Sequence, residues 1–197
     1  MALDATAVYI GLADQTSASG AISSGTVIDA ASVPSTFSDA ETAISAFTAS
    51  GYVSEDGLTL STDYSTTDVR EWNGATVRKL LESFDGTLQF SLIQTDEEGW
   101  KQAFGAENVT ATAATASPGK QLHIALGTHL PEPKAWAFKM KDGDAKFLVL
   151  VCNGQITAVD DITFNATEAI ALPCTLSCYD DGTGESIHIF TDDGQTA

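Results

Sequence analysis

The sequence has few basic residues, and they are confined to its middle. Its 197 residues include 9 Lys and Arg against 27 Asp and Glu, which gives a net charge of −18. Residues 1–69 and 147–197 contain neither Lys nor Arg and carry −9 and −8, whereas residues 70–146 carry −1. Because proteins bind nucleic acid by clustering Lys and Arg against phosphates, we expect no such binding. The negative charge can also serve simply to keep the protein soluble, because like-charged chains repel one another.

Long apolar runs and a basic N-terminus are missing too. The longest apolar run, residues 147–152, is far shorter than the roughly 20 residues of a membrane-spanning helix. The N-terminus holds Asp4 and no Lys or Arg, unlike the start of a signal peptide. We therefore expect no membrane segment and no secretion. A chain with 43% hydrophobic residues can bury one substantial core, so we expect a single domain over residues 1–197.

Cysteine is scarce, with only Cys152, Cys174 and Cys178. On one strand, Cys174 and Cys178 would have Cα atoms about 13 Å apart, too far for a disulfide. Cys152 could reach one of them from a neighbouring strand. The odd number and the lack of a metal-like spacing favour free, partly buried thiols.

Motifs that would indicate a reaction are absent. Gly182-Thr183-Gly184 lies between two expected strands and opens no helix, so it indicates a hairpin turn instead of a phosphate loop. No serine lies in a nucleophile elbow. Acidic pairs that could ligate Ca²⁺ lack the spacing of a calcium loop; they are Asp160 with Asp161, and Asp180 and Asp181 with Glu185. The histidines, His123, His129 and His188, follow no ligand spacing. We expect no catalytic, cofactor-binding or metal site, and no enzyme.

Residues 51–105 carry the clearest pattern of strands and turns. Asp56-Gly57 precedes an alternating run that begins at Leu58, typical of a half-buried strand. Asn73-Gly74 predicts a type I′ hairpin turn between residues 69–72 and 75–81. Asp85-Gly86 predicts a second turn, followed by a strand in which Leu88, Phe90 and Leu92 share one face.

Two short helices are expected beside these strands. Residues 38–49 place Ala40, Ile44 and Phe47 on one face, and Ser38 with Glu41 forms a capping box. Residues 95–104 follow a second capping box, Thr95 with Glu98, and the helix ends at Gly105.

The flanking regions read mainly as β. Residues 7–12 and 26–33 are expected strands, and residues 15–25 are small and polar enough for a mobile arm or loop. Trp136, Phe138 and Met140 share a face, and residues 142–144 predict a hairpin to the next strand. Residues 147–151 are apolar on both faces, so a helix of the same subunit or a neighbour in a ring must cover the second face. Further strands are expected at 156–164, 168–179 and 185–190.

The order of these motifs resembles a known family. The helix at 38–49, residues 51–57, Trp72-Asn73-Gly74, and residues 96–100 follow one another as in the major tail proteins of long, non-contractile-tailed bacteriophages. The resemblance covers residues 36–165 and leaves residues 166–197 unmatched. It implies a mainly β subunit, a two-sheet sandwich or barrel with one or two short helices and a partly mobile N-terminal arm at 1–35.

What the resemblance implies about function is structural. Such subunits close into rings, expected to be hexameric, and stack into the tail tube of the virion after assembly in the bacterial cytoplasm. Expected partners are other copies of the chain, the tape-measure protein, the tail terminator and the distal tail proteins, and double-stranded DNA passes through the lumen without specific binding. The alternative is an all-β carbohydrate- or cell-binding module in which Trp72 or Trp136 stacks on a ligand.

Overall fold

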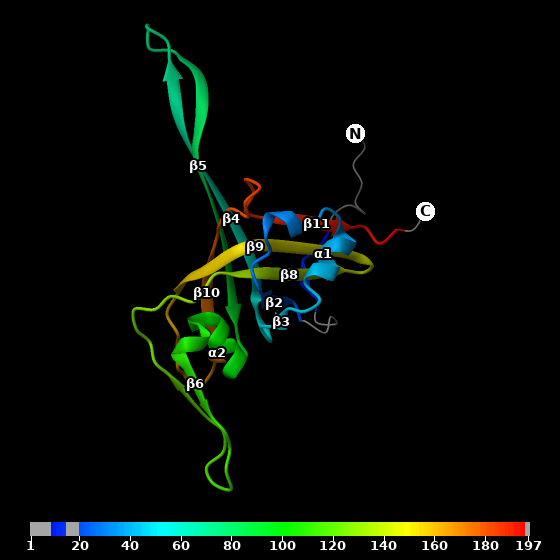
Figure 1. The fold of residues 1–197 in the computed structure, drawn as a ribbon, viewed down its shortest axis with the longest axis vertical. Coiled ribbons are helices and arrows are strands. Elements are labelled where there is room, and N and C mark those ends of the chain that lie inside the picture. The colour runs from blue at the N-terminus through cyan, green and yellow to red at the C-terminus, as the bar shows by residue number, and fades with distance from the viewer. Residues whose placement is uncertain (1–8, 15–19, 196–197) are drawn as a thin grey trace.

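The structure is a computed structural model that describes residues 9–14 and 20–195. The described residues form a mainly β fold that includes two short α-helices and two short 3₁₀ helices (Figure 1). The strands are β1 (Leu12–Ala13), β2 (Ile22–Gly25), β3 (Thr48–Ala49), β4 (Val53–Arg70), β5 (Thr76–Leu92), β6 (Val109–Thr112), β7 (Gln121–Ile124), β8 (Lys134–Asp142), β9 (Ala145–Val159), β10 (Leu172–Cys178) and β11 (His188–Asp192). The helices are η2 (Ala30–Ser32), α1 (Phe37–Ala43), α2 (Glu97–Phe104) and η3 (Ala106–Asn108).

Nine strands form one antiparallel sheet in the order β3-β2-β8-β9-β10-β5-β4. Two strands join off this path: β1 pairs with β8, and β11 pairs with the first part of β9. The sheet is curled, as a contact between two separated strands shows. The ring centroid of Phe90 on β5 lies 5.7 Å from that of Trp136 and 5.3 Å from that of Phe138, both on β8, which is three places away in the sheet. The expected mainly β sandwich or barrel is therefore confirmed, as a large antiparallel sheet with a small second sheet formed by β6 and β7.

The inner face of the curled sheet encloses the larger core. Leu88, Phe90 and Leu92 alternate along β5 and pack against Trp136 and Phe138, as their alternation predicts. Further buried members of this core come from β2, β9 and β10, and they are Ile22, Val149, Val151, Ile156, Leu172, Cys174, Leu176 and Cys178. Helix α2 contributes Ala103, which is buried against the same cluster. These contacts place β5 firmly in the sheet from Gly86 onward.

The outer face of β8 and β9 has its own cover within the subunit. Leu148, Leu150 and Cys152 of β9 are buried in a second cluster with Ala40 and Ile44 from the α1 region. The sequence left open whether a helix of the same subunit or a neighbour in a ring covers the second face of residues 147–151. The structure shows that the helix of the same subunit covers it. Burial on both faces accounts for the loss of alternation in this strand.

The N-cap of α1 lies two residues before the predicted Ser38, and the N-cap of α2 lies one residue after the predicted Thr95. The α1 N-cap is Thr36, whose side chain accepts a hydrogen bond from Asp39 N, and the helix ends at Ala43, well before residue 49. The α2 N-cap is Asp96, whose carboxylate accepts from Gly99 N at 2.9 Å. Thr and Asp oxygens at these positions satisfy free N–H groups of the first turn as well as the predicted residues would. Gly105 ends α2 with φ 89°, as expected.

The turn predicted at Asp85-Gly86 is wrong, because β5 runs straight through both residues. Gly86 pairs with Cys178 on one side and with Thr62 on the other. A Cβ at Gly86 would lie 2.7 Å from the Ile187 side chain, so the glycine permits a close approach of another segment. The Asp-Gly signal here therefore reflects packing and not a chain reversal.

Several flanking expectations also need correction. Residues 22–25 of the expected arm form strand β2, with Ile22 and Ser23 buried, while residues 1–8 and 15–19 lie outside the described residues. Of the expected strand at 7–12, residues 7–8 lie outside the described residues, residues 9–11 are not in a strand, and Leu12 begins β1. Residues 26–33 contain η2 and no strand. The strand expected at 156–164 is the end of β9, which runs without a break from residue 145 to residue 159, and residues 160–164 lie outside the sheet. The hairpin at residues 142–144 is confirmed between β8 and β9.

Candidate assembly surface

The most prominent feature outside the core is a long hairpin made by β4 and β5 (Figure 1). Strand β10 pairs with β5 only as far as Gly86, so beyond this point β4 and β5 pair with each other alone. Residues 59–83, which we call the distal hairpin, are all exposed except Asp68. Figure 1 shows this ribbon projecting along the longest axis of the molecule, with the β6–β7 ribbon at the opposite end.

The reversal at the tip confirms the hairpin predicted from Asn73-Gly74 but not its turn type. Glu71 N donates to Ala75 O at 2.9 Å, and Gly74 N donates to Glu71 O at 2.8 Å. Gly74 has φ 88°, whereas no non-glycine residue in the described part of the chain has a positive φ. Asn73 therefore does not adopt the conformation that a type I′ turn requires. A longer loop joins strands that extend much further than residues 69–81.

Charged groups on the distal hairpin pair both across its two strands and along β4. Lys79 Nζ lies 2.8 Å from Asp68 Oδ1, and Arg70 lies 3.6 Å from the other carboxylate oxygen. The hydrogen bond from Lys79 lowers the pKa of Asp68. Thr67 donates a hydrogen bond to Glu82. Exposed ion pairs are screened by solvent and stabilise a ribbon only slightly, so they do not by themselves explain its length.

Apolar side chains are exposed on both faces of the distal hairpin. Thr66 pairs with Leu81 and Thr67 with Leu80, so these neighbouring leucines point to opposite faces. Leu81 is 59% exposed, and Tyr64, which packs 5.0 Å from Phe84, is 61% exposed. The full set is Leu60, Tyr64, Val69, Trp72, Val77, Leu80 and Leu81. Exposed apolar side chains gathered on one element are typical of an interaction surface.

This geometry can be set beside known proteins. A family model described as "Phage tail tube protein" matches residues 7–197. The chain belongs to the phage tail tube protein family. The resemblance found in the sequence is thereby confirmed, and it extends through residues 166–197, which the motifs had left unmatched.

No curated protein matches the chain. Among solved structures, it is similar to a chain in the cryo-EM structure of the anti-feeding prophage cap, a tube-terminating cap, with 14% sequence identity and a TM-score of 0.41. That similarity covers 68% of this chain and 79% of the other. Membership of the family makes the protein a structural component of a phage tail that contacts other tail proteins.

The two tryptophans proposed as ligand platforms lie in opposite environments in this tail tube protein. Trp136 is 2% exposed and packs against Phe90, so it cannot stack on a ligand. Trp72 is fully exposed at the tip of the distal hairpin. Among residues 9–14 and 20–195, no helix is long and apolar enough to cross a membrane.

Of the acidic residues considered for Ca²⁺, Asp180 is engaged in a local turn, and Asp181 lies beside a cysteine and a histidine. Asp180 Oδ1 accepts hydrogen bonds from the backbone N–H groups of Gly182 and Gly184, which fixes the turn between β10 and β11. Within the described part of the chain, Asp160, Asp161 and Glu185 belong to no group of three or more metal-competent side chains.

The cysteines are free, as expected, and all three are buried and not only partly so. Burial raises the pKa of Cys174 and Cys178 to about 12, and burial together with the charge of Asp181 raises that of Cys152 to about 11. Thiols with such pKa values are poor nucleophiles at neutral pH. His188, however, is not isolated: it lies beside Asp181 and Cys152, a grouping that linear spacing does not reveal.

Proposed function

We propose that the protein polymerises as stacked hexameric rings into the tube of a long, non-contractile phage tail, with residues 1–197 as a single tail-tube domain. The tube is the channel through which DNA reaches the host cell. The observation that carries the proposal is the distal hairpin, which exposes apolar side chains on both faces and pairs with no other strand of residues 9–14 and 20–195. Family membership supports self-assembly into a tube.

The physics of the hairpin supports contact with another copy of the chain. A two-stranded ribbon in water is marginally stable without a third strand or a packed face. Leu80 and Leu81 point to opposite faces, so a partner on one side alone leaves apolar surface exposed. A ring-to-ring junction, in which a ribbon enters between neighbouring subunits, buries both faces. The β6–β7 ribbon at the opposite end of the molecule offers a second axial contact (Figure 1).

Charge supports the same arrangement. Both arginines of the chain, Arg70 and Arg78, lie in the distal hairpin together with Lys79, while the chain as a whole carries −18. Together with its four acidic residues, the ribbon (residues 59–83) carries a net charge of −1, so it repels an acidic neighbour less than residues 1–58 or 147–197, which hold no Lys or Arg. An acidic channel wall repels DNA within a Debye length of about 10 Å at 0.1 M salt, so DNA slides without specific binding.

The remaining roles follow from this assembly. The subunit has no catalytic role, and it meets the tape-measure protein inside the tube and the terminator and distal tail proteins at its ends. Polymerisation takes place in the host cytoplasm. A carbohydrate- or cell-binding module remains the second candidate because Trp72 is exposed at the ribbon tip, where a sugar ring can stack on it.

The test replaces residues 66–82 with Asn-Gly, which joins the paired residues Ser65 and Ser83 by a short hairpin turn. The intact chain should form rings or tubes in negative-stain micrographs, alone or with the phage's tail-tip complex. The shortened chain should remain monomeric and keep its circular dichroism spectrum. Tubes of normal length from the shortened chain would refute the proposal. Glycan binding lost in Trp72→Ala, with no assembly of the intact chain, would favour the second candidate.

A further inference from the structure

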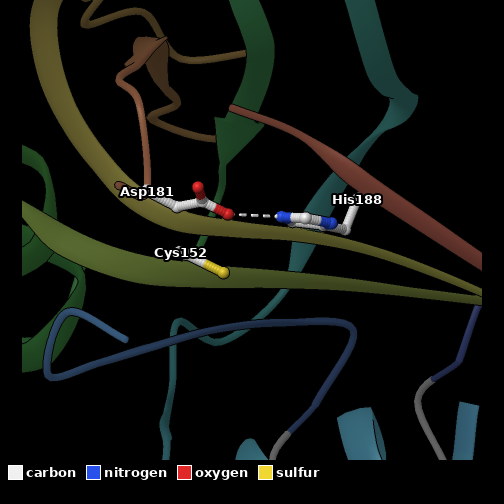
Figure 2. A group of neighbouring side chains, drawn as sticks. All are labelled: Cys152, Asp181 and His188. Carbon is white, nitrogen blue, oxygen red and sulfur yellow. Dashed lines mark hydrogen bonds and ion pairs between the residues drawn. The ribbon is translucent and has the colours of Figure 1, made fainter. Parts of the chain in front are cut away.

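Three potential metal ligands meet where the C-terminal strand joins the sheet (Figure 2). Cys152 lies on β9, Asp181 in the turn after β10, and His188 at the start of β11. Their ligand atoms, the Cys152 sulfur, an Asp181 carboxylate oxygen and a His188 ring nitrogen, all lie within 4.8 Å of one another. The pairing of His188 with Leu150 in the β9–β11 ladder brings these distant segments together.

Neighbouring groups hold the two polar members in place. Thr183 donates two hydrogen bonds to Asp181 Oδ1, from its backbone N at 2.7 Å and its Oγ1 at 2.6 Å. The other oxygen, Asp181 Oδ2, faces His188 Nε2 at 2.8 Å. The second nitrogen, His188 Nδ1, lies 3.6 Å from Glu185 Oε2. A carboxylate beyond the second ring nitrogen, and donors on the non-ligating carboxylate oxygen, are the outer partners that orient ligands in metal sites.

We propose that Cys152, Asp181 and His188 bind a single zinc ion, which fastens the C-terminal strand β11 to β9. Thiolate, imidazole and carboxylate are the three side-chain ligand types of zinc in proteins, and a soft thiolate disfavours Ca²⁺ and Mg²⁺. Three protein ligands leave the fourth tetrahedral position to water. On binding, the Cys152 thiol releases its proton to solvent as the Sγ–Zn bond forms, and His188 binds as the neutral imidazole.

Charge and distance both fit this ion. Zn²⁺ with one thiolate, one carboxylate and a neutral imidazole has no net charge, which suits a site where Cys152 is fully buried and Asp181 is 7% exposed. Zinc–ligand bonds of about 2.0–2.3 Å set ligand atoms roughly 3.3–3.6 Å apart. The Asp181–His188 pair, now hydrogen-bonded at 2.8 Å, has to open by about half an ångström to admit the ion, and a ligand pair as far apart as 4.8 Å has to close by about an ångström.

The zinc site is independent of ring assembly, because all three residues belong to one subunit. It gives residues 179–192, which lie outside the distal hairpin, a structural role in fastening β11 to β9. It also explains why a cysteine, a histidine and an aspartate from separate segments share one buried place. The turn at residues 180–184 then has two tasks, chain reversal and presentation of the Asp181 carboxylate.

The test uses the full-length monomer, stripped of metal, and titrates it with Co²⁺ and with Zn²⁺. We expect one ion per chain, a thiolate-to-cobalt charge-transfer band in the near ultraviolet, and proton release on Zn²⁺ binding. Cys152→Ser should abolish the band, whereas the control Cys178→Ser, at another buried cysteine, should retain it. Thr183→Val, which keeps all three ligands, should weaken Zn²⁺ binding about 10–100-fold.

Circular dichroism of the metal-free variants establishes that each is folded before titration. Zinc should raise the melting temperature of the intact chain and of Cys178→Ser but not of Cys152→Ser. Failure of the intact chain to bind Zn²⁺ saturably, or equal Zn²⁺ affinity in the intact chain and Cys152→Ser, would overturn the proposal. In either case the Asp181–His188 pair is a structural hydrogen bond alone.

Discussion

Two leucines on the same strand should separate folding from assembly. Leu88 of β5 is fully buried in the inner core, whereas Leu81, seven residues earlier, is 59% exposed on the distal hairpin. Leu88→Ala should lower the free energy of unfolding of the monomer by about 2–5 kcal/mol, because it removes transfer free energy and leaves a cavity. In a domain of this size that corresponds to a fall in melting temperature of roughly 4–20 °C.

Leu81→Ala should leave monomer stability within about 0.5 kcal/mol of the intact chain, because its side chain contacts little in the monomer. Burying the exposed part of a leucine at a subunit contact contributes about 1–2 kcal/mol. The critical concentration for tube formation should therefore rise about 5- to 30-fold. Urea unfolding measures the first quantity and sedimentation of polymer the second.

The pair of variants carries its own control, since both make the same chemical change on one strand. Equal destabilisation of the monomer by both changes would show that the distal hairpin packs against the body of its own subunit. Unchanged polymerisation of Leu81→Ala would show that this face of the hairpin stays outside the subunit contacts. Either result refutes the reasoning that separates an inner core from an outer assembly surface.

Three further outcomes are expected. Leu150→Ala, under α1, should destabilise the isolated monomer by about 2–5 kcal/mol in urea, since the outer face of β9 is covered within the subunit. Lys101 and Lys120 lower the pKa of Glu97 to about 2, so this pairing should stabilise α2 above pH 4.5 and be lost as the pH falls toward 2. As the pH falls through that range, hydrogen exchange of α2 should accelerate more in the intact chain than in the Glu97→Gln variant, which lacks the pairing. Tube yield should rise with salt as screening weakens repulsion between subunits that carry −18 each; a yield that falls with salt would show assembly by complementary charge.

Local sequence signals predicted turns and helix ends correctly where the residue type at that position favours a single backbone conformation. Gly105 ends α2, and residues 142–144 reverse the chain between β8 and β9. Asn73-Gly74 marked the hairpin tip, although the loop at the tip is wider than a two-residue turn. Alternation of Leu88 with Phe90 identified the inner face of β5 because one face of that strand is buried.

Other features depend on contacts between distant segments, which local patterns do not encode. Gly86 has the sequence of a turn, but Ile187 packs over it and the strand continues. Strand β2 is too polar to be recognised, yet Ser23 is buried because β2 pairs with both β3 and β8. The length of the β4–β5 hairpin was hidden because its distal residues are exposed on both faces and show no clean alternation.

The candidate sites show the same division. Three histidines with no regular spacing predicted no metal site, whereas the ladder between β9 and β11 places His188 beside two other ligand types. Trp136 was a candidate for ligand stacking by residue type alone, and its burial against Phe90 removes it. Trp72 is exposed because it lies in a loop beyond the last strand pair of the ribbon.

Cryo-EM of the assembled particle tests the central claim most directly. The account predicts stacked rings in which both faces of the distal hairpin, residues 59–83, lie against neighbouring subunits, with Leu80 and Leu81 buried in different contacts. It further predicts that acidic side chains outnumber basic ones on the channel wall. A tube in which the distal hairpin stays in solvent, or purified protein that forms no ring alone or with its tail-tip complex, would contradict it.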